Sequence, residues 1–289
     1  MKKMVCIYSI DKPCYECELE GTCAFSVVFA PSNSEEGFLK NHKGIPRPYS
    51  LYIPDEKNAF LPGEEFTVEM TLVGKAIEYF PYVFLAFKEL GKSGMGKRNE
   101  EGERGKFVLK CIEEVMKDGT CEFIYHSDEM PNGKKIKGFC LDEFFGRDQI
   151  PSGADTFKLV FETPVRLKKD RHITDVPEFY PIMRSIIHKL NAYSYFYGNG
   201  ELKKDAAFLL EEAKNVELVS ANTRFKQYVY YSRRQQNRLY IGGIVGEAIY
   251  RGNLNLFYPY LKIAEVIGVG KNNAFGFGRV KLQALQEER

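Results

Sequence analysis

Apolar and polar residues alternate in two stretches of the N-terminal half, at residues 49–53 and 66–72. A period of two is typical of a half-buried β-strand. Apolar positions then recur with a helical period at 77–90, and a glycine-containing loop and a basic, aromatic strand at 104–110 follow. Strand, helix, loop and strand in this order predict the second half of a β-α-β-β-α-β unit of the ferredoxin-like (RRM-like) type.

The C-terminal half shows the same succession of patterns. A strand is expected at 157–167 and a helix at 176–197, whose apolar positions fall on one stripe. A shorter helical stretch, two strands and an apolar helical run follow at 202–214, within 225–250 and at 261–267. We therefore expect a second ferredoxin-like domain here.

A short motif occurs in both halves. It consists of a glycine, then a proline–tyrosine pair seven residues later, and it reads Gly74, Pro81, Tyr82 in the first copy and Gly252, Pro259, Tyr260 in the second. Each copy continues through an apolar helical run and a glycine loop into a basic, aromatic strand. A period this long indicates two related domains rather than a solenoid.

These patterns predict an α+β protein with tandem ferredoxin-like domains, the first of them abbreviated at its N-terminus. We expect a cysteine-rich segment at 1–30, a first domain at 31–150 and a second domain at 151–289. The length of 289 residues and the apolar content of 44% suffice for two cores.

The loop at 268–280 reads GVGKNNAFGFGRV and contains Gly268, Gly270, Gly276 and Gly278. Glycine permits positive φ and close approach of another molecule to the backbone. Consecutive N–H groups of such a loop can form a concave anion-binding nest, and Lys271 and Arg279 add positive charge. We expect free N–H groups along this loop and a phosphodiester backbone bound to it. A helix C-cap followed by a mobile connection is the alternative.

A second candidate binding segment, YVYYSRRQQNRLYIGG, spans the two strands expected within 225–250. Its tyrosines interleave with cations, and the candidate contacts are Tyr231, Arg233, Arg234, Gln235 and Arg238. Aromatic rings stack on unpaired bases, and guanidinium groups bind phosphates. The alternative is a solvated hairpin whose tyrosines are half in the core.

The overall charge excludes a polycation, because the formal net charge is only +2. Any nucleic-acid site must therefore come from local clustering of cations. No apolar span approaches the length of a membrane helix, and Met1-Lys-Lys is followed by too short and polar a run for a signal peptide. We expect a cytoplasmic protein without a membrane partner.

Four of the seven cysteines lie within the first 23 residues, at Cys6, Cys14, Cys17 and Cys23. In a reducing compartment a disulfide framework is disfavoured, and four thiolates can close a tetrahedral metal site. We expect a structural zinc ion here. An iron–sulfur cluster and simple reduced thiols are the alternatives.

The loop, with YSRRQ at 231–235 and LYIGGIVGE at 239–247, resembles the RAMP superfamily of CRISPR-associated proteins. More narrowly, it is similar to the C-terminal-domain type of repeat-processing endoribonuclease. The resemblance implies tandem ferredoxin-like domains and cleavage of CRISPR precursor RNA within its repeats, without a metal or other cofactor, to give mature guide RNA. Many relatives have a histidine where this chain has Gly268 or near Tyr197.

Metal-free RNA cleavage needs a base for the 2′-OH, an acid for the 5′-oxygen and cations for the phosphorane. Histidine suits the first two roles near neutral pH. The candidates are His42, with Lys43 beside it, and His188 on the helix at 176–197. The alternative function is a non-catalytic RAMP subunit that binds guide RNA among the other subunits of a CRISPR effector complex.

Overall fold

The structure is a computed structural model that describes residues 2–8, 13–31, 45–54, 57, 59–127, 135–145, 155–170, 172–200, 206–232 and 236–285. The chain divides into two compact units. The first unit comprises Met1–Pro48 and Val73–Glu143, and the second comprises Tyr49–Leu72 and Phe144–Arg289.

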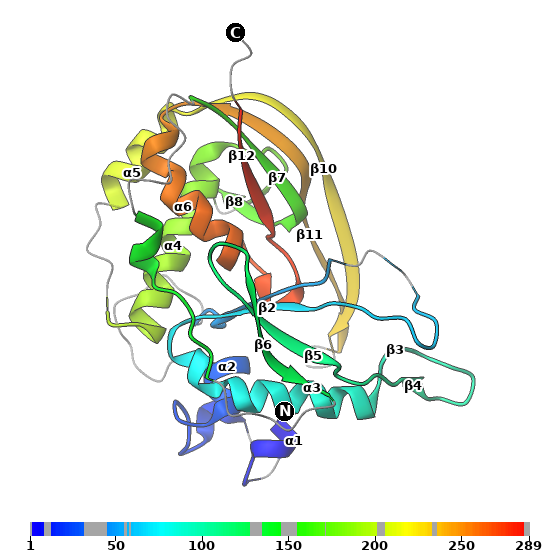
Figure 1. Cartoon of the computed structure of the whole chain (residues 1–289). Coiled ribbons are helices and arrows are strands. Elements are labelled where there is room, and N and C mark those ends of the chain that lie inside the picture. Colours follow the sequence, from blue (N-terminus) through cyan, green and yellow to red (C-terminus); the bar gives the residue numbers. More distant parts are fainter. Residues whose placement is uncertain are drawn as a thin grey trace. The chain divides into compact units, whose positions relative to one another are not determined.

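The second unit contains a four-stranded antiparallel sheet with the strand order β10-β11-β7-β12 (Figure 1). Its elements follow along the chain as β7 (Thr156–Val165), α4 (Phe179–Tyr197), β10 (Glu217–Ser232), β11 (Asn237–Arg251), α6 (Leu254–Ile267) and β12 (Val280–Ala284). A short helix, α5 (Ala206–Glu212), precedes β10. This is the ferredoxin-like order β-α-β-β-α-β. The predicted α+β class is confirmed.

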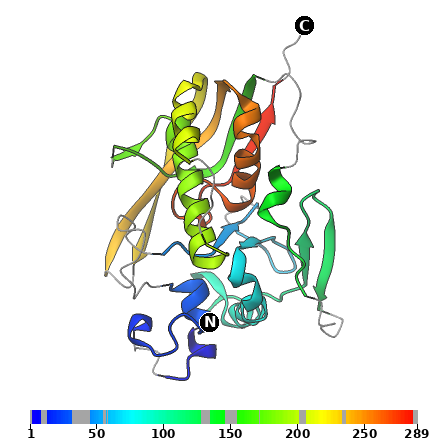
Figure 2. The same ribbon diagram turned by 90° about the vertical axis from the view of Figure 1, so that its left-hand side faces the viewer.

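Helices α4 and α6 lie side by side on one face of this sheet (Figure 2). The core forms between them and the sheet, because alternate residues of β7 point to that face and are buried, among them Phe157 and Phe161. The expected apolar stripe of α4 is also buried, at Ile182, Ile186, Ile187, Leu190 and Tyr193. The buried Tyr250 hydroxyl donates to Pro177 O at 2.6 Å, so the core keeps this polar group satisfied.

Strands β1 (Tyr49–Tyr52) and β2 (Glu69–Leu72) pair antiparallel and cluster with the second unit, although the sequence assigned them to the domain at 31–150. Hydroxyl groups of Ser50 and Thr71 donate to Val266 O at 3.4 and 3.0 Å. These bonds satisfy a carbonyl in the last turn of α6 that has no partner within the helix. Strands β8 (Leu167–Lys169) and β9 (His172–Thr174) form a further pair. The domain boundaries stay predictions.

The first unit contains the helices α1 (Lys2–Val5), α2 (Ala24–Phe29) and α3 (Phe80–Ser93). Its described strands form two antiparallel pairs, β3 (Met95–Arg98) with β4 (Arg104–Gly105) and β5 (Cys111–Val115) with β6 (Cys121–His126). Helix α3 ends at Gly94 with φ +72°, and α6 ends at Gly268 with φ +75°. Both halves of the sequence repeat thus form a 14-residue helix that is followed by a glycine with positive φ. The arrangement is consistent with tandem ferredoxin-like domains.

Two predicted strands are shorter than expected. The strand at 104–110 ends after Gly105, and the last strand begins only at Val280, although the residue pattern at 274–282 predicts a strand from Ala274 onward. A 3₁₀ turn (Asn273–Phe275) and two left-handed glycines, Gly276 and Gly278, interrupt extended backbone before β12. In the described part of the chain, no helix combines the length and the apolar character that crossing a bilayer requires.

Candidate nucleic-acid interface

The glycine-rich loop connects α6 to β12 in the second unit. It turns sharply because Gly268, Gly270, Gly276 and Gly278 all have φ between +75° and +87°, and Asn272 is also left-handed at +70°. L-residues with a side chain disfavour this region, and asparagine tolerates it better than most. The four glycines are therefore required by the path of the loop.

The N–H groups of this loop are largely bonded within the protein, contrary to the expectation of free donors. Val269 N–H donates to Gly278 O, Lys271 N–H to Arg166 O and Gly278 N–H to Pro164 O. Gly270 N–H donates to the hydroxyl of Ser185 on α4 at 2.8 Å. These donors do not form an open anion nest. RNA binding by Gly268, Gly270, Gly276 and Gly278 stays a prediction.

The glycines also permit close packing inside the loop. A Cβ atom at Gly278 would lie 2.1 Å from Asn273 Nδ2, and one at Gly268 would lie 2.6 Å from the same atom. At Gly270 it would lie 2.6 Å from Arg166 O. The loop is thus folded around the buried side chain of Asn273, which is only 6% exposed.

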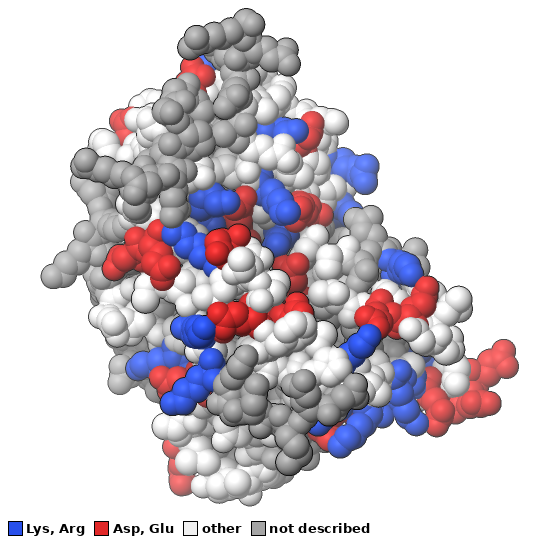
Figure 3. All heavy atoms as spheres, in the orientation of Figure 1, with Lys and Arg blue, Asp and Glu red and all other residues white. Residues whose placement is uncertain are grey.

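Three cations gather beside the loop. The backbones of Arg166 and Lys271 form a β-bridge, and Lys168 follows in β8. Partial desolvation lowers the pKa of Lys271, and the charges of Lys168 and Arg166 lower it further. Desolvation is the larger cause, and the two smaller charge effects show that Lys168 and Arg166 are close enough to Lys271 for an anion here to interact with all three cations. On the face seen in Figure 3, by contrast, acidic and basic side chains are interspersed.

The long hairpin of β10 and β11 extends past the sheet. Only the part of β11 from Ile244 onward pairs with β7, so residues 226–232 and 237–243 form a two-stranded hairpin arm. On one face of the arm, Tyr228 contacts Phe277 of the loop and Tyr230 contacts Phe275, with ring centroids 5.7 and 6.1 Å apart. Phe275 is 54% exposed, so this face carries aromatic surface in contact with solvent.

The opposite face of the arm presents Tyr231 and Tyr240, which are 57% and 62% exposed. Directly paired residues share a face, so Arg238, the partner of Tyr231, lies on this face as well. Tyr231 OH is 2.9 Å from Gln236 Oε1 and donates to it. Two tyrosines and a guanidinium are thereby brought together on one exposed surface.

Arg279 is engaged with the protein itself. Its guanidinium forms ion pairs with Glu69 at 3.1 Å and Glu162 at 3.5 Å, and it lies 4.6 Å from the ring centroid of Tyr52. Its backbone N–H donates to Thr163 Oγ1. These contacts give Arg279 a structural role between β12, β7 and the β1–β2 pair, and an RNA contact by this residue stays a prediction.

The candidate acid–base residues differ in what the structure describes of them. His42 and Lys43 lie outside the described residues, and so do the arm residues Arg233, Arg234 and Gln235. His188 is exposed on α4. The three catalytic assignments therefore stay predictions.

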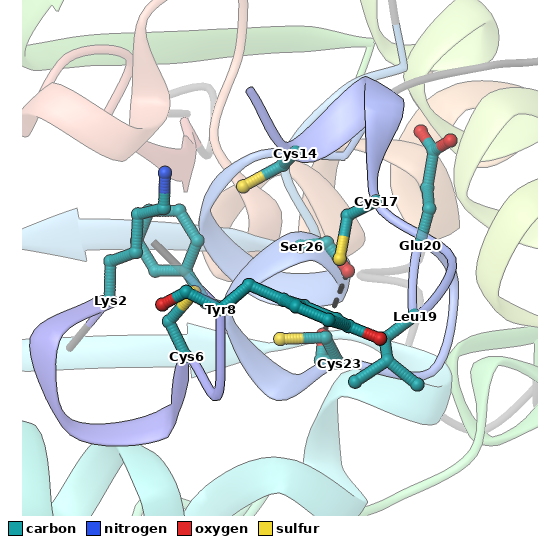
Figure 4. Close-up of a pocket in the computed structure, with 10 residues that line it drawn as sticks. Lys2, Cys6, Tyr8, Cys14, Cys17, Leu19, Glu20, Cys23 and Ser26 are labelled. Atoms are coloured by element: carbon teal, nitrogen blue, oxygen red, sulfur yellow. Dashed lines mark hydrogen bonds between the residues drawn. The ribbon is translucent and has the colours of Figure 1, made fainter. Parts of the chain in front are cut away.

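The four N-terminal cysteines line one pocket in the first unit (Figure 4). Burial raises the pKa of the Cys14 thiol, Lys2 lowers it, and the thiols of Cys23, Cys17 and Cys6 raise it. Tyr8 and Leu19 line the same pocket. Among the residues that the structure describes, no cluster of histidine, cysteine or acidic side chains is close enough to hold a metal ion. The cysteines are brought together, and the metal site stays a prediction.

Sequence reasoning missed three side chains that organise the loop. Lys189 and Ser185 of α4 bond to the loop, and neither stands in a recognisable motif, whereas Asn273 lies in the loop motif but was not singled out. The only sequence signal was the position of Ser185 and Lys189 four residues apart, which places them on one side of a helix. Lys168 belongs to a visible basic run, but its proximity to Lys271 depends on tertiary structure.

Comparison with known proteins agrees with this fold. Residues 159–280 match the family model described as CRISPR-associated endoribonuclease Cas6, and residues 1–136 match a model described as an N-terminal domain, AF_1859_N. A search of curated proteins finds no match.

Among solved structures, one titled "Cas6 (TTHB231) product complex" is 20% identical, with a TM-score of 0.51, over 84% of this chain and 85% of that chain. The structure of Thermus thermophilus Cas6 (TTHB231) is 20% identical over 82% and 79% of the two chains, with a TM-score of 0.48. The "Cas6 (TTHA0078) product complex" is 17% identical over 83% of each chain, with a TM-score of 0.46. At this identity the first of these shows the fold.

The region with the ferredoxin-like topology and the region of the family match coincide, because residues 159–280 span most of the sheet and both of its covering helices. This region carries a domain that is similar to the family described as CRISPR-associated endoribonuclease Cas6.

The packing of the loop predicts that two alanine substitutions lower the free energy of unfolding by different amounts. Gly278→Ala and Gly276→Ala both place a side chain at positive φ, which costs about 1–2 kcal/mol. At Gly276 the nearest atom to an added Cβ is Leu51 O at 3.9 Å, whereas at Gly278 it meets Asn273 and Val269 at 2.1 and 2.2 Å. Gly278→Ala should therefore lower the free energy of unfolding, measured with denaturant, by a further 1–3 kcal/mol or so. Equal losses would contradict the close packing.

Proposed function

We propose that this protein binds CRISPR repeat RNA through its second unit and cleaves it within the repeat without a metal ion. The observation that supports this most directly is the cation cluster of Arg166, Lys168 and Lys271 beside exposed aromatic rings. Clustered like charges repel one another, and a phosphodiester backbone that enters the cluster relieves this repulsion. The match of residues 159–280 to an endoribonuclease family supports this reaction class for the site.

The exposed aromatic residues supply a second kind of RNA contact, the stacking of bases on their rings. Tyr230 on one face of the arm, with Phe275 of the loop packed beside it, and Tyr231 and Tyr240 on the other face expose ring surface on which unpaired bases can stack. Stacking tolerates any base, so it supports affinity for single-stranded segments. In this proposal Arg238 and the arm residues Arg233, Arg234 and Gln235 contact phosphates and base edges, and Lys271 binds phosphate.

Cleavage requires proton transfer at two oxygens. One residue must take the proton of the 2′-OH, and we assign this role of general base to His42. Lys43 beside it would stabilise the charge that develops on the phosphorane. His188, exposed on α4, is the second candidate for the acid–base pair. The 2′-oxygen attacks the adjacent phosphorus, its proton goes to the base, and the 5′-oxygen leaves with a proton from the acid.

Removal of the cations should change the salt dependence of RNA binding. Lys168→Ala/Lys271→Ala should weaken binding of repeat RNA and lower the slope of log Kd against log salt by about 0.7–0.9 for each phosphate that is no longer neutralised. Arg233→Ala/Arg234→Ala should act in the same direction. The control is Lys214→Ala, because Lys214 is paired with Glu211 at 2.7 Å. An unchanged slope in both double variants, with the fold intact, would move the RNA-binding surface elsewhere.

Substitution of the proposed general base, His42, should slow RNA cleavage without weakening RNA binding. His42→Ala should slow cleavage of labelled repeat RNA in EDTA by about 10² to 10⁴ and leave its affinity nearly unchanged, because phosphate contacts dominate affinity. His126→Ala on β6 serves as the control. If His188→Ala abolishes cleavage and His42→Ala does not, the active site belongs to α4. A wild-type protein that binds repeat RNA and never cuts it would favour the non-catalytic effector subunit.

For the first unit we propose one structural metal ion, zinc before an iron–sulfur cluster, bound by Cys6, Cys14, Cys17 and Cys23. The support is that all four thiols line one pocket and that the other three raise the pKa of Cys14. Four thiolates leave no open coordination position, so such an ion has a folding role and takes no part in cleavage.

Metal analysis tests this proposal. The reduced, freshly purified protein should contain about one equivalent of zinc or of cluster iron, and Cys14→Ser/Cys17→Ser should lose it. Cys111→Ser/Cys121→Ser is the matched control, because both of these cysteines are exposed on β5 and β6. Less than about a third of an equivalent of any metal in the wild-type protein would contradict a four-thiolate site.

A further inference from the structure

Helix α4 places a lysine ammonium group among backbone and side-chain oxygens. Lys189 Nζ donates to Gly268 O at 2.6 Å, to Asn273 Oδ1 at 2.5 Å and to Ile267 O at 3.4 Å. Within the described residues, the ion pairs do not include Lys189. An ammonium group has three N–H donors, and here all three meet neutral oxygens. Burial lowers the pKa of Lys189 to about 7, although the side chain as a whole is only half-buried.

Two of these acceptors belong to the C-terminus of α6. Ile267 is the last residue of the helix and Gly268 is its C-cap. Carbonyl groups there have no partner within the helix, and the helix dipole makes this end electronegative. A cation from α4 is therefore stabilised at the point where the glycine-rich loop begins.

The third acceptor is the side chain around which the loop is folded. Asn273 accepts from Lys189 through Oδ1 and donates through Nδ2 to Val269 O at 3.2 Å and Phe277 O at 2.8 Å. It thus connects the two ends of the loop to each other and to α4. Loss of the Lys189 ammonium would leave a buried amide oxygen and a helix-end carbonyl without a donor.

A second contact holds the loop to the same helix. Ser185, one turn before Lys189 on α4, accepts from Gly270 N–H at 2.8 Å. The residue after Gly270 is Lys271, and Phe275 follows Asn273 in the 3₁₀ turn. The exposed charge of Lys271 therefore lies next to Gly270, and the exposed ring of Phe275 lies two residues after Asn273. Both Gly270 and Asn273 are bonded to α4.

We propose that Lys189 is a positioning residue for RNA binding: through Asn273 and Gly268 it holds the loop in the one conformation that presents Lys271 and Phe275 together. Lys189 does not itself contact the RNA. This inference rests on the proposed function of the loop as an RNA-binding surface. It adds that the affinity for RNA depends on how well Lys189 orders the loop.

The test uses Lys189→Met, which keeps an unbranched stem and removes all three donors, and Arg184→Met on the exposed side of α4 as the matched control. Amide hydrogen exchange of the RNA-free proteins should show loop residues 268–278 of Lys189→Met exchanging about tenfold faster or more, since a hydrogen bond to a charged group contributes that much. Amides of β7 and β11 should exchange at wild-type rates. Arg184→Met should resemble wild type throughout.

Repeat-RNA binding separates positioning from direct contact. Lys189→Met should weaken binding about tenfold at an unchanged salt slope, because every cation that binds phosphate is still present. A slope lowered by about 0.7–0.9 would show that Lys189 binds a phosphate itself and would overturn the positioning role. Unchanged affinity of the folded variant would reduce Lys189 to a purely structural residue.

A double-variant cycle tests the connection through Asn273. Lys189→Met/Asn273→Leu should bind RNA no more weakly than the worse single variant, because both substitutions break the same link. Additive losses would overturn the link. If Lys189→Met does not fold, Lys189→Gln, which keeps two N–H donors, replaces it in all three measurements with the same expected directions.

If wild-type protein binds no RNA, the proposed function fails, and the RNA part of this inference fails with it. The exchange experiment remains decisive for the loop in that case. Loop amides that exchange equally in Lys189→Met and wild type would show that Lys189 does not hold the loop.

Discussion

A lysine nitrogen that is withdrawn from solvent needs hydrogen-bond acceptors in the protein, and here that requirement connects a helix to a loop. The Lys189 ammonium satisfies it with Gly268, Asn273 and Ile267, which come from the end of α6 and the interior of the glycine-rich loop. Because α4 also carries the apolar stripe that covers the sheet, the core and the loop share one rigid support. The surface formed by Lys271 and Phe275 depends on that support.

The sequence predicted the repeating parts of the fold because burial imposes a period on it. The stripe of α4 and the alternation of β7 identify both elements, and the order of the elements then indicates a ferredoxin-like unit. The ends of elements were less accurate: β10 begins at Glu217 rather than near Phe225, since its pairing with β11 continues to Arg251. Backbone hydrogen bonds can continue a strand beyond the residues whose apolar and polar side chains alternate, and the sequence pattern then does not indicate where the strand begins.

The candidate site was predictable only in part. Glycine content correctly indicated the left-handed turns of the loop, but it could not show that Pro164, Arg166 and Ser185 would bond the loop donors. Those partners are about a hundred residues away in the chain and meet the loop only in the folded protein. Lys189 was hidden for a related reason: a lysine beside apolar positions normally extends into solvent, and only the tertiary structure shows that this one turns inward.

The hairpin arm can accept substitutions that the rest of the second unit cannot. Residues of the arm such as Tyr231 and Tyr240 lie beyond the sheet and outside the core, so their replacement changes stability by only a few tenths of a kcal/mol in the ordinary case. Positions of this kind accept new side chains without compensation elsewhere. The identity of the bound partner can therefore drift during evolution, or be altered by design, while the sheet and its two helices stay as they are.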